Sequence, residues 1–213
     1  TLSSSSAASD VYKRQHKLMR KIGNWMPSKA DINSEKWNEV TEVVNDNFYF
    51  IENERYDLDA VLQKGAELVK RKGIKCLVID PYNKIKMNGA SNMSIPDATM
   101  EYLTRIEAFA KKHDVLVIVV AHPTKMYKKE DGTIDEPNMY NIKGGGEWYD
   151  ASYHGLLVHR DYNKKTVKVK VLKVKFQNLG ENQAEAHFKW DHISGNYIPV
   201  FDVSNEIMPW EVG

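Results

Sequence analysis

The sequence has a single cysteine, no long hydrophobic stretch and almost no net charge. Cys76 cannot form an internal disulfide in this chain of 213 residues, which fits a reducing compartment. The longest apolar stretches, 76–79 and 115–121, are far too short to cross a bilayer. The 30 basic and 29 acidic residues nearly cancel, so any binding of nucleic acid has to come from local clusters. We therefore expect a cytoplasmic protein that makes no membrane contact.

The first residues of the chain give no indication of a folded element. Residues 1–15 have no apolar periodicity, no hydrophobic signal region and no initiating methionine. They resemble a translated adapter at a cut gene end, with native sequence beginning near His16, and a natural disordered tail is the alternative. We expect a helical lead-in at 16–46, one main domain at 47–203 and a short tail at 204–213.

Hydrophobic periodicity predicts alternating helices and strands in the rest of the chain. In chain order we expect a helix at 34–44, a strand at 47–51, a helix at 57–71, a strand at 74–79, a helix at 97–113 and a strand at 115–120. A short helix then follows the glycines at 144–146, and strands at 155–159 and 166–176 lead to a last hairpin that ends near Pro199. Apolar strands separated by helices are typical of an α/β fold with a mainly parallel sheet flanked by helices. The C-terminal part adds a β-hairpin.

Two polar residues follow the central apolar strands. Asp80 comes directly after IKCLVI, and His122 comes after VLVIVVA. Ligands of open parallel sheets bind beyond the carboxyl ends of the strands. An apolar strand that ends in aspartate is typical of a Walker B motif, whose carboxylate orients Mg²⁺ beside nucleotide phosphates. The alternatives are that Asp80 caps the strand and that His122 is a hydrogen-bonded structural residue.

The strand TVKVKVLKVKF has lysines where a half-buried strand should be apolar. The valines at 167, 169 and 171 share one face, and Lys168 and Lys170 take the other. Without a bulge near Leu172, Lys173 and Lys175 fall on the valine face, where an unpaired ammonium is costly. Either the register shifts, or these two lysines leave the sheet to meet a negative group.

Five segments, taken in order and spacing, resemble the C-terminal motor of DnaB-like replicative helicases. They are IKCLVIDPYNKI, AFAKKHDVLVIVVAHPTK, the basic loop 123–143, IKGGGEWYDASYHGLLVHRD and VLKVKFQNLG. The similarity runs from about Asn47 to Val200 and is to the Twinkle and bacteriophage primase-helicase branch in particular. It implies a RecA-like P-loop NTPase core in a hexameric ring that translocates on single-stranded DNA. It further implies Mg²⁺ and ATP or another NTP as cofactors, a fused or separate primase, and a bacterial or phage-infected cell.

The same resemblance implies roles for residues at the strand ends and in the basic loop. Asp80 matches the Walker B aspartate, and His122 matches the position that contacts the γ-phosphate and reports its presence to the DNA side. Lys125, Lys128 and Lys129 match the central-channel loop, where lysines suit a motor that must hold phosphates without reading bases. A solvated lysine cluster is the alternative for that loop.

Further positions match by the same resemblance. Gly144, Gly145 and Gly146 match a small-residue segment that approaches DNA or a neighbouring subunit, and we add Lys143 to this DNA contact; an ordinary turn before a helix is the alternative. Lys173 and Lys175 match a finger that reaches into the next subunit's nucleotide site, although an arginine is usual where Lys175 stands, and a lysine cannot form its bidentate fork. Arg160 and Trp190 match residues that enclose the nucleotide base, and a core position is the alternative for Trp190.

The phosphate-binding loop GxxxxGK(S/T) occurs nowhere in the chain, and the family's catalytic glutamate has no secure match. We therefore interpret the sequence as a truncated segment of a helicase motor that is inactive alone, whereas its intact parent hydrolyses NTP. Another RecA-like ATPase, such as a recombinase, is one alternative. A non-catalytic RecA-like module that binds single strands or a partner is the other.

Overall fold

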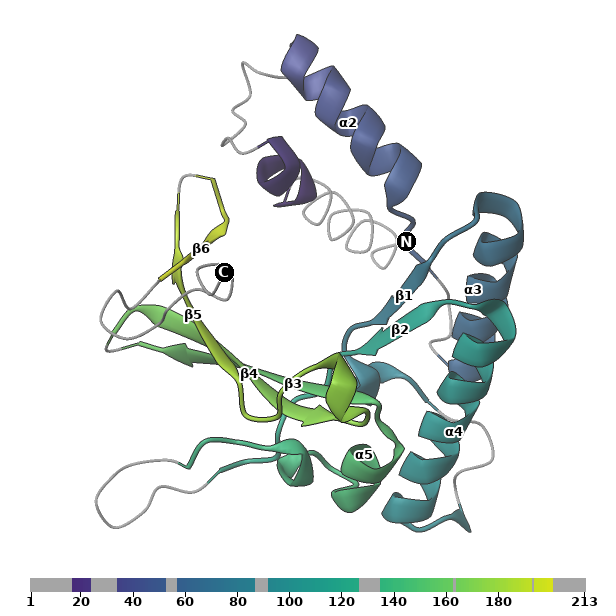
Figure 1. Ribbon diagram of the computed structural model, residues 1–213. Helices are drawn as coiled ribbons and strands as arrows, with labels where there is room; N and C mark the ends of the chain where they lie inside the picture. The colour runs from purple at the N-terminus through teal and green to yellow at the C-terminus, as the bar shows by residue number, and fades with distance from the viewer. Residues whose placement is uncertain are drawn as a thin grey trace. The chain divides into compact units, whose positions relative to one another are not determined.

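The chain divides into two compact units that alternate along the sequence. The computed structural model describes residues 17–23, 34–52, 57–86, 92–126, 135–162, 164–192 and 194–200. One unit comprises 1–48, 156–171 and 183–213, and the other comprises 49–155 and 172–182. Figure 1 labels the helices and strands of both units. No helix in the described ranges is long and apolar enough to cross a membrane.

The helix α2 (Glu35–Asn47) confirms the predicted helix at 34–44 and extends it. It begins after Ser34, whose side-chain oxygen accepts the Trp37 backbone N–H at 3.2 Å. Val40 and Val44 are buried with Met19 of the helical residues 17–23. The predicted strand at 47–51 is wrong, because Asn47 is the last residue of α2 and residues 48–52 form no strand. The aromatic composition of that stretch favoured a strand, but the helical period continues through Asn47.

The helices α3 (Leu58–Lys72) and α4 (Ile95–His113) confirm the predictions at 57–71 and 97–113. Asp57 begins α3 by accepting the Ala60 backbone N–H at 2.8 Å, and Gly73 ends it with a φ of 65°. Ser94 begins α4, and Asp114 ends it in the left-handed conformation. The predicted ends differ from the observed ones by at most two residues.

The strands β1 (Cys76–Ile79) and β2 (Leu116–Val119) form a parallel pair in which Ile79 lies opposite Val119. The helix α4 connects them, packs against α3 and contacts β2. Leu77 and Ile79 are buried, but Val78 and Leu116 on the other face are 55% and 59% exposed. The sequence predicted strands covered on both faces; among the described residues of this unit, α3 and α4 cover the face of Leu77 and Ile79 only.

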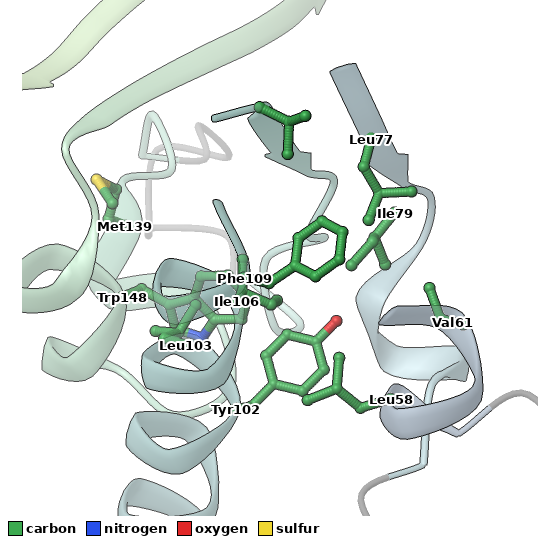
Figure 2. Packing of buried hydrophobic residues seen from close by; sticks show 11 residues of the cluster. Leu58, Val61, Leu77, Ile79, Tyr102, Leu103, Ile106, Phe109, Met139 and Trp148 are labelled. Carbon is green, nitrogen blue, oxygen red and sulfur yellow. The ribbon is translucent and has the colours of Figure 1, made fainter. Parts of the chain in front are cut away.

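A cluster of buried side chains holds the unit of 49–155 and 172–182 together (Figure 2). Its members come from both helices, from β1, from the residue before β2 and from the segments before β3: Leu58, Val61, Leu77, Ile79, Tyr102, Leu103, Ile106, Phe109, Val115, Met139 and Trp148. Gly65 allows α3 to approach this core closely, because a Cβ there would lie 3.0 Å from Phe109 Cζ. Burial of each large apolar side chain contributes roughly 2 kcal/mol.

A four-stranded sheet follows in the C-terminal part, in the order β3 (His154–Asp161), β4 (Thr166–Val174), β5 (Glu185–Trp190) and β6 (Tyr197–Pro199). The pairs β4–β5 and β5–β6 are antiparallel, which confirms the predicted last hairpin. The short helix α5 (Gly146–Ala151) follows the glycines as predicted. Single 3₁₀ turns occur at Tyr82–Lys84, Met139–Asn141 and Gln177–Leu179.

Candidate functional site

Asp80 and His122 lie at the same edge of the parallel pair, beyond the carboxyl ends of its strands. The Val120 backbone N–H donates to the Ile79 carbonyl at 2.8 Å, so the two chains leave the strands side by side. Asp80 directly follows β1, and His122 follows β2 by three residues. Both side chains are exposed. This edge is where parallel sheets bind ligands, and the roles of the two residues stay predictions.

The segment after Asp80 is tied to the turn that carries the glycines. The Tyr82 hydroxyl and the Trp148 indole N–H both donate to the Lys143 carbonyl, each at 3.0 Å. The Tyr82 and Trp148 rings also meet edge to face at 4.7 Å between centres. Two donors therefore fix one carbonyl of the turn, while the Lys143 side chain is exposed.

Gly144 and Gly145 are required by their backbone conformation, with φ of 104° and 56°. A Cβ at Gly144 would lie 2.3 Å from Thr99 Oγ1, whereas a Cβ at Gly145 would meet nothing within 4 Å. Thr99 is buried on α4. The turn therefore packs directly against the helix that connects β1 and β2, and α5 begins at Gly146.

The two ends of the basic loop are held together next to this turn. Pro123 forms an antiparallel bridge with Ile142, and Thr124 donates its backbone N–H and its hydroxyl to the Asn141 carbonyl at 2.7 and 2.9 Å. Lys125 directly follows these contacts of Pro123 and Thr124 and is exposed. Lys128 and Lys129, which were assigned to the same DNA contact, lie outside the described residues.

The strand β4 runs from Thr166 to Val174, and its regular pairing with β5 extends from Thr166 to Lys170. Val167 is buried early in the strand, whereas Val174 is buried and Leu172 is packed on the core at its end. Because 167 and 174 differ in parity, the buried face changes along the strand. This change matches the alternative of a register shift, because it places Lys173 and Lys175 on the face opposite Leu172 and Val174.

Lys173 meets the carboxyl end of α5. Its Nζ donates to the carbonyl oxygens of Tyr149 and Asp150, the latter at 3.3 Å, and lies 4.6 Å from the centre of the Tyr149 ring. Burial lowers the pKa of Lys173 from its ordinary value, an effect that the Asp150 carboxylate opposes and the neighbouring Lys175 reinforces. The carbonyls at the end of a helix stabilise such a cation.

Lys175 follows β4 and lies over a second tyrosine. Its Nζ is 4.0 Å from the centre of the Tyr153 ring, and the Tyr153 hydroxyl donates to Glu107 Oε1 at 2.9 Å. Lys111 Nζ is 2.7 Å from the same oxygen. Hydrogen bonds from Lys111 and then from Tyr153 lower the pKa of Glu107, and the Lys111 and Lys175 charges add to this. Each of the two lysines assigned to the finger is thus held by its own tyrosine.

Arg160 and Trp190 have different partners. The Arg160 guanidinium carbon lies 5.2 Å from the centre of the Tyr162 ring. Trp190 packs against Tyr197 with 4.8 Å between ring centres, and the Arg20 guanidinium carbon lies 5.9 Å from the Trp190 ring. Both predicted base-binding residues belong to the unit of 1–48, 156–171 and 183–213, whereas Asp80 belongs to the other. Their shared contact with a nucleotide base remains a prediction.

Asp80 fits a magnesium site that is completed by a nucleotide. In the described ranges, no group of three His, Cys, Asp or Glu side chains could hold a metal ion by itself. Mg²⁺ keeps several waters and uses one or two carboxylates together with substrate phosphates, so one exposed carboxylate at this edge matches its requirements.

Four aromatic residues of the site were not predicted from the sequence. Tyr82 and Trp148 fix the glycine turn, and Tyr149 and Tyr153 hold the finger lysines. Their spacing in the sequence could have indicated them. Tyr82 follows Asp80 by two residues, and Tyr149 and Tyr153 are four residues apart, a spacing at which side chains of a helix share one face.

Both the fold and the sequence of the chain are similar to those of known proteins. The chain shares its fold with a DnaB-like replicative helicase whose structure was solved with a view to its interactions with primase, at a TM-score of 0.64 and 16% identity, over 87% of this chain and 47% of that one. It is 30% identical over 171 residues to the Twinkle homolog protein, chloroplastic/mitochondrial, of Arabidopsis thaliana, which covers 76% of this chain and 24% of that relative. No protein-family model matches the chain.

The fold is therefore that of a DnaB-like, RecA-type helicase domain, and the α/β class predicted from the sequence is confirmed. Together with the sequence similarity, it identifies the chain as a DnaB/Twinkle-type helicase domain. The chain spans about a quarter of the length of the curated relative and about half of the solved helicase chain.

Proposed function

We propose that the chain is a segment of the motor of a hexameric, NTP-dependent replicative DNA helicase that translocates on single-stranded DNA. The observation that carries the proposal is the shared edge of β1 and β2, where Asp80 and His122 lie beside a glycine turn that Tyr82 ties to the same strand end. The similarity to the Twinkle homolog supports the same reading of the sequence.

At this edge, Asp80 is the carboxylate that would hold Mg²⁺ together with nucleotide phosphates. Mg²⁺, when bound, would neutralise negative charge on the phosphates of ATP or another NTP during phosphoryl transfer. His122 distinguishes triphosphate from diphosphate by bonding differently to each, and a residue with such a difference in bonding can shift the neighbouring loop between two states.

Single-stranded DNA contacts residues next to this edge. Lys125 and Lys143 supply charge at the two ends of the clamped loop, and Gly144 and Gly146 allow the backbone to approach the strand closely. Lys128 and Lys129 belong to the same contact by sequence. A loop that grips phosphates through lysines suits movement along any base sequence.

Neighbouring subunits complete each nucleotide site in the proposed ring. Lys173 and Lys175 neutralise charge in the next subunit's site, and Tyr149 and Tyr153 hold them in place until the ring assembles. Arg160 and Trp190 enclose the nucleotide base. Primase, fused or separate, is the partner proposed for the intact protein in the cytoplasm of a bacterial or phage-infected cell.

The chain alone is proposed to be inactive, because it contains no phosphate-binding loop. The second face of the parallel pair supports a missing segment, because within the described residues of this unit Val78, Leu116 and Ile118 are 55%, 59% and 43% exposed. Parallel strands are normally covered on both faces. A further segment of the intact protein that packs on this face would account for their apolar character.

The DNA contact is tested by fluorescence anisotropy with a labelled oligothymidylate. Lys125→Gln/Lys143→Gln is compared with Lys36→Gln/Lys164→Gln, which removes the same charge from exposed positions of the other unit. We expect the first pair to weaken binding about tenfold and to lower the slope of log affinity against log salt by about 1.4. Equal effects of the two pairs would reject this edge as a DNA contact.

A further inference from the structure

A second concentration of positive charge lies at the other edge of the parallel pair. The helix α3 ends in three consecutive basic residues, and α4 ends in two lysines and a histidine. A further lysine lies between α3 and β1. We refer to six of these cations as the basic edge: Lys70, Arg71, Lys72, Lys75, Lys111 and Lys112.

The chain path brings these residues together. Each helix runs directly into a strand of the parallel pair, and α3 packs against α4, so the carboxyl ends of both helices lie at the amino ends of the strands (Figure 1). The Leu116 backbone N–H donates to the Lys75 carbonyl at 2.9 Å, which joins the segment after α3 to the start of β2. Asp80 and His122 lie at the opposite ends of the same strands.

The positive charge of the basic edge is poorly balanced. All six cations are exposed. Three carboxylates lie near the six cations: Glu67 pairs with Lys64 at 2.9 Å, Glu107 pairs with Lys111 at 2.7 Å, and Asp114 follows α4 and is exposed. Within the described ranges, Lys70, Lys75 and Lys112 have no ion-pair partner.

Favourable helix ends explain only part of this pattern. Cations stabilise a helix within its last turn, where five of the six lie: Lys70, Arg71 and Lys72 on α3, and Lys111 and Lys112 on α4. Lys75 lies outside both helices and cannot act in this way. Lysines that are exposed and mobile at their tips are suited to phosphate groups, which they hold as point charges without selecting a base.

We propose that the basic edge is a second binding surface for the phosphate backbone of a nucleic-acid strand. The proposal rests on the proposed function only in taking nucleic acid as the partner. The surface is separate from the DNA contact at Lys125 and Lys143, because the two lie at opposite ends of β1 and β2. A motor with both surfaces can hold one strand at each edge of its sheet.

The test uses the chain as it is and compares two triple variants of equal charge. Lys70→Gln/Lys75→Gln/Lys112→Gln removes charge from the basic edge, and Lys36→Gln/Lys164→Gln/Lys189→Gln removes it from exposed lysines of the other unit. Anisotropy of a labelled oligothymidylate is measured over a range of salt. We expect the basic-edge triple to weaken binding about tenfold and to lower the salt slope by about 2, with a much smaller effect of the control triple.

The outcomes separate this proposal from the proposed function. Unchanged binding by the basic-edge triple, with binding lost only in Lys125→Gln/Lys143→Gln, would overturn the second surface and leave the first contact in place. Loss in the basic-edge triple alone supports the second surface and counts against the first. Equal losses in both triples would show a bulk charge effect and reject the proposal. Competition by polyglutamate as strong as by unlabelled oligothymidylate would also reject it, because the surface would then favour any acidic polymer.

Discussion

At the scale of single residues, two polar groups near the glycine turn differ in their hydrogen bonding: one carbonyl accepts two hydrogen bonds, and one buried hydroxyl makes none in the described part of the chain. The Lys143 carbonyl accepts from Tyr82 and Trp148, whereas the Tyr102 hydroxyl is buried without a hydrogen-bond partner in the described part of the chain. Both tyrosines belong to the same aromatic group, with 5.7 Å between their ring centres. Burial raises the pKa of both hydroxyls, most strongly that of Tyr102.

These two tyrosines give a matched pair of substitutions. Tyr82→Phe keeps the ring contacts but removes one donor to Lys143, and we expect it to lower the free energy of unfolding by about 1 kcal/mol. Tyr102→Phe removes a hydroxyl that makes no bond, so stability should stay unchanged or rise by about 1 kcal/mol. Urea unfolding of both variants measures the difference. A larger loss in Tyr102→Phe than in Tyr82→Phe would contradict this account of the aromatic group.

The two glycines of the turn make a second comparison. Gly144→Ala is expected to cost about 3 kcal/mol, because the new methyl group meets Thr99 in addition to straining the backbone. Gly145→Ala strains the backbone but faces open space, so a cost of about 1.5 kcal/mol is expected. Thermal or urea unfolding checks the order, and equal costs would show that contact with Thr99 does not limit position 144.

At the scale of elements, α5 connects two parts of the candidate site. Its first residue follows the glycine turn, and its last carbonyls receive the ammonium of Lys173. Movement of the glycine turn on binding DNA would therefore shift α5 and change the hydrogen bonds of Lys173. The helix has only six residues, so contacts at its two ends contribute a large share of its stability.

Removal of the Lys173 charge should destabilise this part of the chain. Lys173→Met keeps the apolar stem but leaves the α5 carbonyls without their donor, and we expect a loss of about 1 kcal/mol in the free energy of unfolding. Lys164→Met, at an exposed turn position, serves as the control. If both variants unfold at the same urea concentration, Lys173 does not hold the end of α5.

The contact of Glu107 with Tyr153 and Lys111 predicts a dependence of stability on pH. Because the folded chain lowers the pKa of Glu107 from 4.5, its contribution is complete above pH 4.5 and is lost as the pH falls through the lower, folded pKa. The wild type should therefore be more stable than Glu107→Gln near neutral pH, and the two should converge in acid. A difference that persists unchanged at low pH would exclude the carboxylate as its origin.

Elements were predicted well where local chemistry determines them. Ser34, Asp57 and Gly73 fixed helix ends close to the predicted positions, because caps act within a few residues. The strand at 47–51 failed because aromatic composition carries less information than the helical period that precedes it. The partners of Lys173 could not be predicted, since the α5 carbonyls lie more than twenty residues away in the sequence.

At the scale of the whole molecule, the sequence and the fold agree on a DnaB/Twinkle-type helicase domain, with about a quarter of the curated relative's length represented. That Asp80 and His122 lie at the same edge could be predicted from the sequence, because both follow apolar strands, and parallel strands bind ligands at their carboxyl ends. The basic edge could not be predicted in this way, because its cations come mainly from two helices that only the tertiary structure brings together.

The most direct measurement is NTP hydrolysis, with and without single-stranded DNA, by the intact protein recovered by reading the source DNA upstream of the chain. Our account predicts a GxxxxGK(S/T) loop in that upstream region, hydrolysis stimulated by single-stranded DNA, and a loss of at least about a hundredfold in Asp80→Asn. Hydrolysis that is unaffected by Asp80→Asn, or an intact protein that has no phosphate-binding loop and no NTPase activity, would contradict it.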